Sequence, residues 1–199
     1  MIRGILFDFD GTLTHPAALD FPLMRRSIGC PDEMDILGFI DSLETADARR
    51  DAMDKINRIE LDAATVSDPM PGAEKLIADC RKRGLTLGIL TRNSHDAVHV
   101  ALANFAGVDV DDFAVIVSRD SDAAAKPKPD GVLLAAREMK VPPSDLVMIG
   151  DFTYDIEAGE AAGATTVFMQ NGDPGYTFKT PPSYTIHHLD ELLKLPCFR

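Results

Sequence analysis

Short apolar runs recur along the chain at intervals that suit a sheet of parallel strands. The first run holds Ile5, Leu6, Phe7 and Phe9, and the pair Gly11-Thr12 breaks it with a turn. Its nearly continuous apolar character predicts a strand that is buried on both faces. Five further runs predict strands at 85–90, 114–117, 146–150, 165–169 and 184–186.

Helix-like segments with recognisable ends lie between several of these runs. Ser94 is a candidate N-cap for a helix stopped by Gly107, whose apolar positions recur every three or four residues: Ala97, Val98, Ala101, Leu102 and Phe105. Asp130 is a candidate N-cap for another helix, through Val132, Leu133 and Ala136. Alternating strands and helices predict the α/β fold class, with a doubly wound parallel sheet and right-handed crossovers.

Residues 16–71 interrupt this alternation, because they contain no convincing strand. The segment instead predicts three helices: a short one opened by Pro22, one around Met34 to Leu43, and a long one with Ala52, Met53, Ile56, Ile59 and Ala63 on one face. Pro69, Pro71 and Gly72 close it. The predicted organisation is a core of residues 1–15 and 72–199 with a helical insertion at 16–71.

Polar side chains follow three of the predicted strands. Asp8 and Asp10 end the first run, Thr91-Arg92-Asn93 follow the second, and Asp151 follows the run at 146–150. A charge in a buried strand is costly unless a metal or another partner compensates it. The carboxyl edge of an open α/β sheet is also where ligands bind. We therefore expect these residues to share one site.

The order and spacing of four motifs resemble those of the haloacid dehalogenase superfamily: Asp8-Phe9-Asp10-Gly11-Thr12, then Thr91, then Lys126-Pro127-Lys128-Pro129, then Gly150-Asp151-Phe152-Thr153-Tyr154-Asp155. The match is closest to the phosphoglycolate-phosphatase-like branch, which has a small helical cap. The motifs cover residues 8–155, and Tyr184 to Leu195 fit the family's closing strand and helix. The resemblance implies a Rossmann-like core, a cap at 16–71, and a Mg²⁺-dependent phosphatase that hydrolyses a small phosphorylated metabolite through an aspartyl-phosphate.

The two aspartates of the first motif are the candidate catalytic residues. Asp8 is the candidate nucleophile, since a carboxylate can accept a phosphoryl group. Asp10 is the candidate general acid/base that protonates the leaving oxygen and later activates water. The resemblance assigns the two roles in this order.

The acidic residues also predict a metal site. If Asp8, Asp10, Asp151 and Asp155 converge, they repel one another, so we expect a cation among them. Oxygen ligands favour a hard ion, and a phosphate substrate favours Mg²⁺. The family pattern implies carboxylates from Asp8 and Asp151 and the backbone carbonyl of Asp10, with Asp155 orienting the lysine or a metal-bound water. The alternative role for Asp155 is the N-cap of a helix running to Gly163.

Two loops are expected to bind the phosphate. Thr91 offers its hydroxyl, and the backbone N–H groups of Arg92 and Asn93 add donors at a helix N-terminus. Arg92 departs from the family pattern, in which an asparagine comes next, and its side chain either holds substrate or points to solvent. Prolines should hold the second loop extended. Its position before Pro-x-Pro selects Lys126 over Lys128 as the lysine that neutralises the nucleophile and the phosphoryl group.

The remaining basic side chains give weaker signals. His95 and His99 lie one helical turn apart, but an exposed helix face explains them better than zinc. His15, next to the first motif and directly before the insertion, is the histidine worth testing. Arg25 and Arg26 are candidates for binding a carboxylate or second phosphate on an acidic metabolite. A solvated helix face is the alternative for at least one of them.

Other functions share the same scaffold. A metal-independent haloacid dehalogenase uses the same nucleophile, but its motif typically lacks the second aspartate. A phosphomutase must close a lid over a phosphorylated intermediate, and this insertion is short for a lid. A non-catalytic binding role is disfavoured because no catalytic position is substituted.

Composition and charge limit the classes of binding partner that we expect. The 199 residues are 45% hydrophobic and 26% charged, and the net charge of −12 argues against sequence-independent binding to nucleic acid. No apolar run approaches the ~20 residues of a membrane span. Met1-Ile2-Arg3-Gly4 leads directly into the first strand without a signal peptide, so we expect a cytoplasmic protein. Cys30, Cys80 and Cys197 have no disulfide or zinc-site spacing.

Overall fold

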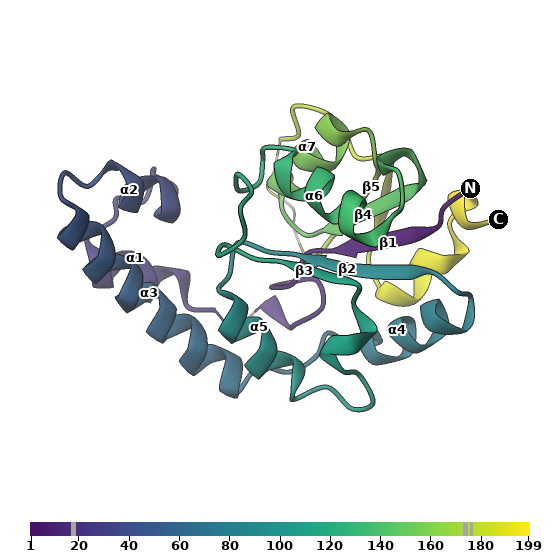
Figure 1. Ribbon diagram of the computed structural model, residues 1–199, viewed down its shortest axis with the longest axis horizontal. Helices are drawn as coiled ribbons and strands as arrows, with labels where there is room; N and C mark the ends of the chain where they lie inside the picture. Colours follow the sequence, from purple (N-terminus) through teal and green to yellow (C-terminus); the bar gives the residue numbers. More distant parts are fainter. Residues whose placement is uncertain (17–18, 173–174, 176) are drawn as a thin grey trace.

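The computed structural model describes residues 1–16, 19–172, 175 and 177–199, and it has an α/β fold (Figure 1). Six strands form one sheet in the order β3-β2-β1-β4-β5-β6, and all neighbouring pairs are parallel. The predicted doubly wound sheet is thus confirmed. The strands are β1 (Gly4–Phe7), β2 (Thr86–Leu90), β3 (Val115–Val117), β4 (Leu146–Gly150), β5 (Thr165–Met169) and β6 (Tyr184–Ile186).

Helices cover both faces of the sheet, which explains the apolar strands. Alternate residues of β1 enter different hydrophobic clusters, since Ile5 and Phe7 belong to one and Leu6 to the other. The first cluster includes residues of α4 (Ala73–Lys82) and α5 (His95–Leu102), and the second includes residues of α6 (Asp130–Met139) and α7 (Thr153–Ala162). Figure 1 shows these pairs on opposite sides of the sheet.

Three helices extend to one side of this layered core (Figure 1): α1 (Phe21–Ile28), α2 (Ile36–Ser42) and α3 (Ala46–Thr65). We call α1, α2 and α3 the cap helices. They enclose a hydrophobic cluster of their own: Met24, Cys30, Ile36, Ile40, Ala52 and Ile56. The division of the chain into a core of 1–15 and 72–199 and a cap of 16–71 stays a prediction.

Two chain segments connect the cap helices to the core, and they run side by side. Thr14 and Pro69 form an isolated antiparallel bridge. The His15 amide donates to the Asp68 carbonyl across 2.9 Å, and the Met70 amide donates to the Leu13 carbonyl across 2.7 Å. The start and the end of residues 16–71 are therefore held together by backbone hydrogen bonds.

Helix ends differ from the predictions in three places. Ser94 caps α5 as expected, but α5 ends at Leu102, well before Gly107. Asp130 is the first residue of α6 and not its N-cap, because Pro129 takes that position, without a side-chain capping bond. After β6 the chain forms a 3-10 helix at Leu189–Lys194. Within the described residues, no helix is long and apolar enough to cross a bilayer.

Candidate active site

A cavity of about 490 Å³ opens at the carboxyl ends of the central strands. The chain departs from the centre of the sheet in opposite directions at β1 and β4, so their ends leave a crevice between the following loops. The cavity lining contains the eight residues predicted for the site: Asp8, Asp10, Thr91, Arg92, Asn93, Lys126, Asp151 and Asp155.

Lys126 joins two of the buried carboxylates. Its ammonium donates to Asp8 Oδ1 across 2.5 Å and to Asp155 Oδ1 across 2.6 Å, and a third bond of 3.0 Å reaches the Leu90 carbonyl. Burial alone would lower the pKa of Lys126, but the charges of Asp155 and Asp8 outweigh burial and raise it above its ordinary value. The lysine is therefore a fixed positive charge beside the carboxylate of Asp8.

The loop that carries Lys126 is a turn, contrary to the extended loop predicted from its prolines. The Lys128 amide donates to the Ala125 carbonyl across 3.1 Å. This turn places Lys126 inside the protein, where its side chain is 4% exposed. Lys128 lies on the surface. Of the two lysines of the motif, Lys126 is thus buried and Lys128 is exposed.

Asp155 has two structural contacts at once. It is the third residue of α7, and its Oδ2 accepts the Phe152 amide across 3.0 Å. The N-cap position belongs to Phe152, so the alternative that made Asp155 the N-cap is wrong. The other carboxylate oxygen of Asp155, Oδ1, accepts the hydrogen bond from Lys126. Burial and repulsion from Asp8 raise the pKa of Asp155 to about 6, although Lys126 opposes this shift.

Three carboxylates form a group able to hold a metal ion. Oxygens of Asp8, Asp151 and Asp155 all lie within 4.8 Å of one another. Burial and repulsion from Asp8 and Asp155 raise the pKa of Asp151 to about 8. A set of oxygen donors that repel one another in this way fits a hard divalent cation. The side chain of Asp10 is outside this group, and its predicted contribution is a backbone carbonyl.

Asp10 occupies a different environment from Asp8. Its Oδ2 accepts a hydrogen bond from the Asn93 side chain across 3.1 Å. Burial, followed by repulsion from Asp8, raises the pKa of Asp10 to about 7; Glu60 adds to the shift and Asn93 opposes it. This carboxyl can both give and take a proton near neutral pH.

The loop after β2 differs in detail from the predicted phosphate-binding loop. The Asn93 amide is not free, because it donates to Thr91 Oγ1 across 3.0 Å. The Ser94 amide donates to Asn93 Oδ1 across 2.8 Å, which fixes the orientation of the Asn93 side chain. Thr91 and Asn93 are both 5% exposed. With its oxygen accepting from Asn93, the Thr91 hydroxyl keeps its proton for another acceptor.

Arg92 lines the cavity and joins the core to the cap helices, and its role in holding substrate stays a prediction. Its Nη2 donates to Asp35 Oδ1 across 2.6 Å and to Asp35 Oδ2 across 2.7 Å. The guanidinium carbon lies 5.3 Å from the centre of the Tyr154 ring. Asp35 also caps α2, where it accepts the Gly38 amide across 2.8 Å.

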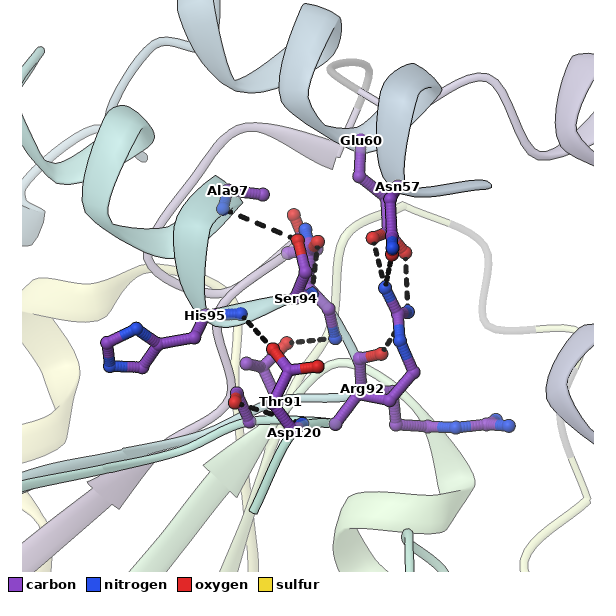
Figure 2. Close-up of polar contacts among 12 residues, drawn as sticks. Asn57, Glu60, Thr91, Arg92, Ser94, His95, Ala97 and Asp120 are labelled. Carbon is purple, nitrogen blue, oxygen red and sulfur yellow. Dashed lines mark hydrogen bonds and ion pairs between the residues drawn. The ribbon is translucent and has the colours of Figure 1, made fainter. Parts of the chain in front are cut away.

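A second connection between cap and core was not predicted. Arg119 donates to Glu60 Oε1 across 2.8 Å and to Glu60 Oε2 across 2.6 Å. It also donates to Asn57 Oδ1 across 2.6 Å and to the Arg92 carbonyl across 2.9 Å. Figure 2 shows Asn57 and Glu60 of α3 pointing toward the loop that carries Arg92. One sequence signal was available, because Glu60 lies four residues after the buried Ile56.

The other candidate side chains have separate positions. Arg25 lines the cavity, but its Nη1 donates to the Pro31 and Met34 carbonyls across 2.7 and 2.6 Å. Arg26 is exposed and is not part of the lining. His15 is part of it. His95 and His99 of α5 are outside the three-carboxylate group, and their Nε2 atoms are 3.2 Å apart.

Comparisons with known proteins give consistent matches. A family model described as haloacid dehalogenase-like hydrolase matches residues 2–163. An uncharacterized hydrolase of Saccharomyces cerevisiae is 33% identical over 98% of this chain and 90% of its own length. A phosphoglycolate phosphatase of Pectobacterium atrosepticum is 28% identical over 86% of this chain and 81% of its own. The crystal structure of a hydrolase from Pseudomonas syringae superimposes with a TM-score of 0.78, at 23% identity and 96% coverage of both chains.

Proposed function

The chain belongs to the haloacid dehalogenase-like hydrolases and is a phosphomonoester hydrolase of their phosphoglycolate-phosphatase type, and we propose that it uses Mg²⁺ and an aspartyl-phosphate on Asp8 to hydrolyse a small phosphorylated metabolite. One observation carries this proposal. Asp8, Asp10, Asp151 and Asp155 line one cavity, and Lys126 contacts two of them, Asp8 and Asp155. A phosphate monoester adds still more negative charge, so a divalent cation is needed to balance the site.

Asp8 is the proposed nucleophile. A carboxylate oxygen of Asp8 attacks phosphorus, a new O–P bond forms, and the bond to the leaving oxygen breaks. Lys126, 2.5 Å from Asp8 Oδ1, neutralises negative charge on the nucleophile and on the transferring phosphoryl oxygens. The hydroxyl proton of Thr91 is available to a phosphoryl oxygen. When bound, Mg²⁺ supplies charge neutralisation and orients the phosphoryl group.

Asp10 is the proposed proton carrier. As a carboxylic acid it protonates the leaving oxygen, and as a carboxylate it then takes a proton from the water that attacks the phosphorylated Asp8. Inorganic phosphate leaves and both side chains return to their starting states. A pKa of about 7 suits the two steps, because both forms of Asp10 are populated near neutral pH. Asn93 orients the carboxyl through its 3.1 Å hydrogen bond.

The core and the inserted segment have separate proposed roles. Residues 1–15 and 72–199 carry the reacting groups, and residues 16–71 cover the cavity and contact the leaving group. Asp8, Asp151 and the Asp10 carbonyl are the proposed metal ligands. Asp155 holds Lys126 in position through its 2.6 Å contact.

Phosphate release from p-nitrophenyl phosphate and from a set of phosphorylated metabolites tests this proposal. We expect EDTA to abolish release and Mg²⁺ to restore it. Release that persists in EDTA would contradict the role of the metal. Full restoration by zinc alone would point to a site built on histidine. The absence of release from every phosphate ester would refute the proposed function.

A further inference from the structure

The part of the cavity lined by residues of 19–60, Arg92 and Arg119 carries a small excess of negative charge. With Asp8, Asp10, Asp151, Asp155 and Lys126 set aside, the charged lining among the described residues comprises three arginines and four carboxylates: Arg25, Arg92, Arg119, Asp32, Glu33, Asp35 and Glu60. The leaving group of a phosphate ester must occupy this side, since the phosphoryl group lies at Asp8. The charges here therefore bear on which leaving groups are accepted.

Each of the three arginines already has acceptors. Arg119 is 10% exposed and binds both oxygens of Glu60. Arg25 donates to two main-chain carbonyls. Arg92 is paired with both oxygens of Asp35. A substrate carboxylate or second phosphate would have to displace one of these acceptors before it could gain a cation.

The Arg92–Asp35 pair is the one that substrate can reach. Its side chains are 25% and 35% exposed, against 10% and 4% for Arg119 and Glu60. Arg92 also keeps a buried Nε for which the structure shows no hydrogen-bond partner. Because this Nε has almost no exposed surface, a substrate in the cavity reaches Arg92 through the part of the guanidinium that is paired with Asp35. An anion that approaches Arg92 also approaches the charge of Asp35, whose two carboxylate oxygens lie 2.6 and 2.7 Å from Arg92 Nη2.

We propose that the substrate is a phosphate monoester whose leaving group carries no second negative charge, and that Asp35 sets this preference by occupying Arg92. The inference rests on the proposed phosphatase activity. A hydroxylated or cationic leaving group lies favourably beside Asp32, Glu33 and Asp35, whereas a carboxylate is repelled by them. This replaces the expectation that Arg25 or Arg26 binds an acidic group.

Three two-carbon esters test the preference with little change in size: 2-hydroxyethyl phosphate, phosphoethanolamine and phosphoglycolate. Each competes with p-nitrophenyl phosphate in the presence of Mg²⁺, and the apparent inhibition constant is measured. We expect the neutral and cationic esters to inhibit the wild-type protein about 10-fold more strongly than phosphoglycolate. Inhibition that favours phosphoglycolate, or that does not depend on the charge of the leaving group, would overturn the proposal.

Substitution of Asp35 tests the mechanism. Asparagine is as good an N-cap as aspartate, so Asp35→Asn keeps the bond to the Gly38 amide and removes the negative charge that is paired with Arg92. The ratio of inhibition constants should shift about 10-fold toward phosphoglycolate. Adding Arg92→Gln should abolish the shift. Asp41→Asn removes one exposed carboxylate from the same helix and should leave the ratio unchanged.

The outcomes separate the two proposals. If wild-type protein releases phosphate neither from p-nitrophenyl phosphate nor from any of the phosphorylated metabolites, the proposed function fails and this inference fails with it. If hydrolysis occurs and Asp35→Asn leaves the ratio unchanged, the role of Asp35 is wrong while the phosphatase activity stands. An equal shift in Asp41→Asn would assign the effect to overall charge and would also overturn the role of Asp35. Thermal unfolding of each variant checks that the fold is intact.

Discussion

Glu60 and Arg119 form an ion pair inside the wall of the cavity, with side chains only 4% and 10% exposed. Glu60 comes from α3, whereas Arg119 follows β3, so the pair fastens a cap helix to the core. The same guanidinium donates to the Arg92 carbonyl across 2.9 Å. The position of the loop after β2 is therefore coupled to the position of α3.

Breaking this pair should destabilise the protein. Glu60→Gln leaves the Arg119 charge buried without its counter-ion, and we expect the free energy of unfolding to fall by about 3 kcal/mol. Urea unfolding measures the change. Asp51→Asn on the same helix breaks the exposed Lys55–Asp51 pair and serves as the control, with an expected loss below about 1 kcal/mol. Equal losses would mean that burial does not set the strength of the Glu60 pair.

The roles of Asp8 and Asp10 predict a difference that mass spectrometry can detect. Asp8→Asn removes the nucleophile, so turnover of p-nitrophenyl phosphate should fall at least ~1,000-fold and no phosphorylated protein should form. Asp10→Asn should also turn over slowly, because water is no longer activated. Intact mass should nevertheless show a phosphorylated species, since nitrophenolate leaves without a proton. A phosphorylated Asp8→Asn protein would place the nucleophile elsewhere.

The two lysines of the proline-rich turn should differ sharply when replaced. Lys126→Ala removes the ammonium that contacts Asp8 and Asp155, and kcat should fall at least ~100-fold. Lys128→Ala removes an exposed side chain and should change kcat less than about 2-fold. Steady-state kinetics with p-nitrophenyl phosphate measure kcat for both variants. Similar losses in both variants would show that the buried position of Lys126 is not the catalytic one.

The raised carboxyl pKa values predict how the metal-free protein responds to pH. In the folded state the pKa values of Asp155, Asp10 and Asp151 are raised to about 6, 7 and 8 from an ordinary value of 3.8. Between about pH 4 and pH 8 the folded state thus binds more protons than the unfolded state, so the free energy of unfolding decreases as pH rises. Lys126 stays protonated throughout this window and adds no slope.

Thermal unfolding in EDTA measures this dependence. Through these three groups Tm should fall between pH 5 and pH 8.5, and Mg²⁺ should raise Tm more at pH 8.5 than at pH 5. Asp151→Asn removes the group with the highest of the three pKa values and should flatten the decline. A Tm that rises over the same interval would contradict the repulsion among these carboxylates.

The strands and the residues at their ends were predictable because both are local features. A buried parallel strand needs a run of apolar residues, as in Leu146–Gly150, and a polar side chain directly after such a run must lie at the edge of the sheet. Asp8 and Asp151 could be located by this logic. Lys126 could not, since its loop is a turn. Its assignment came from the resemblance to a family.

The contacts between cap and core were not predictable, because they join residues far apart in the chain. Arg92 was identified, but no local pattern indicates that its partner is Asp35. Glu60 was missed, although Ala52, Ile56, Glu60 and Ala64 recur every four residues and share the buried face of α3. An acidic residue in such a series needs a buried partner. Only the tertiary structure shows that this partner is Arg119.

The bridge between Thr14 and Pro69 makes the intervening segment a closed loop whose ends the core holds together. The entropy of joining those ends depends only weakly on the length between them, and doubling that length adds only about 0.6 kcal/mol. Helices can therefore be lengthened, removed or exchanged at this one point while the sheet keeps its carboxylates in place. Such an attachment allows substrate specificity to change, in evolution or by engineering, while the hydrolytic reaction stays the same.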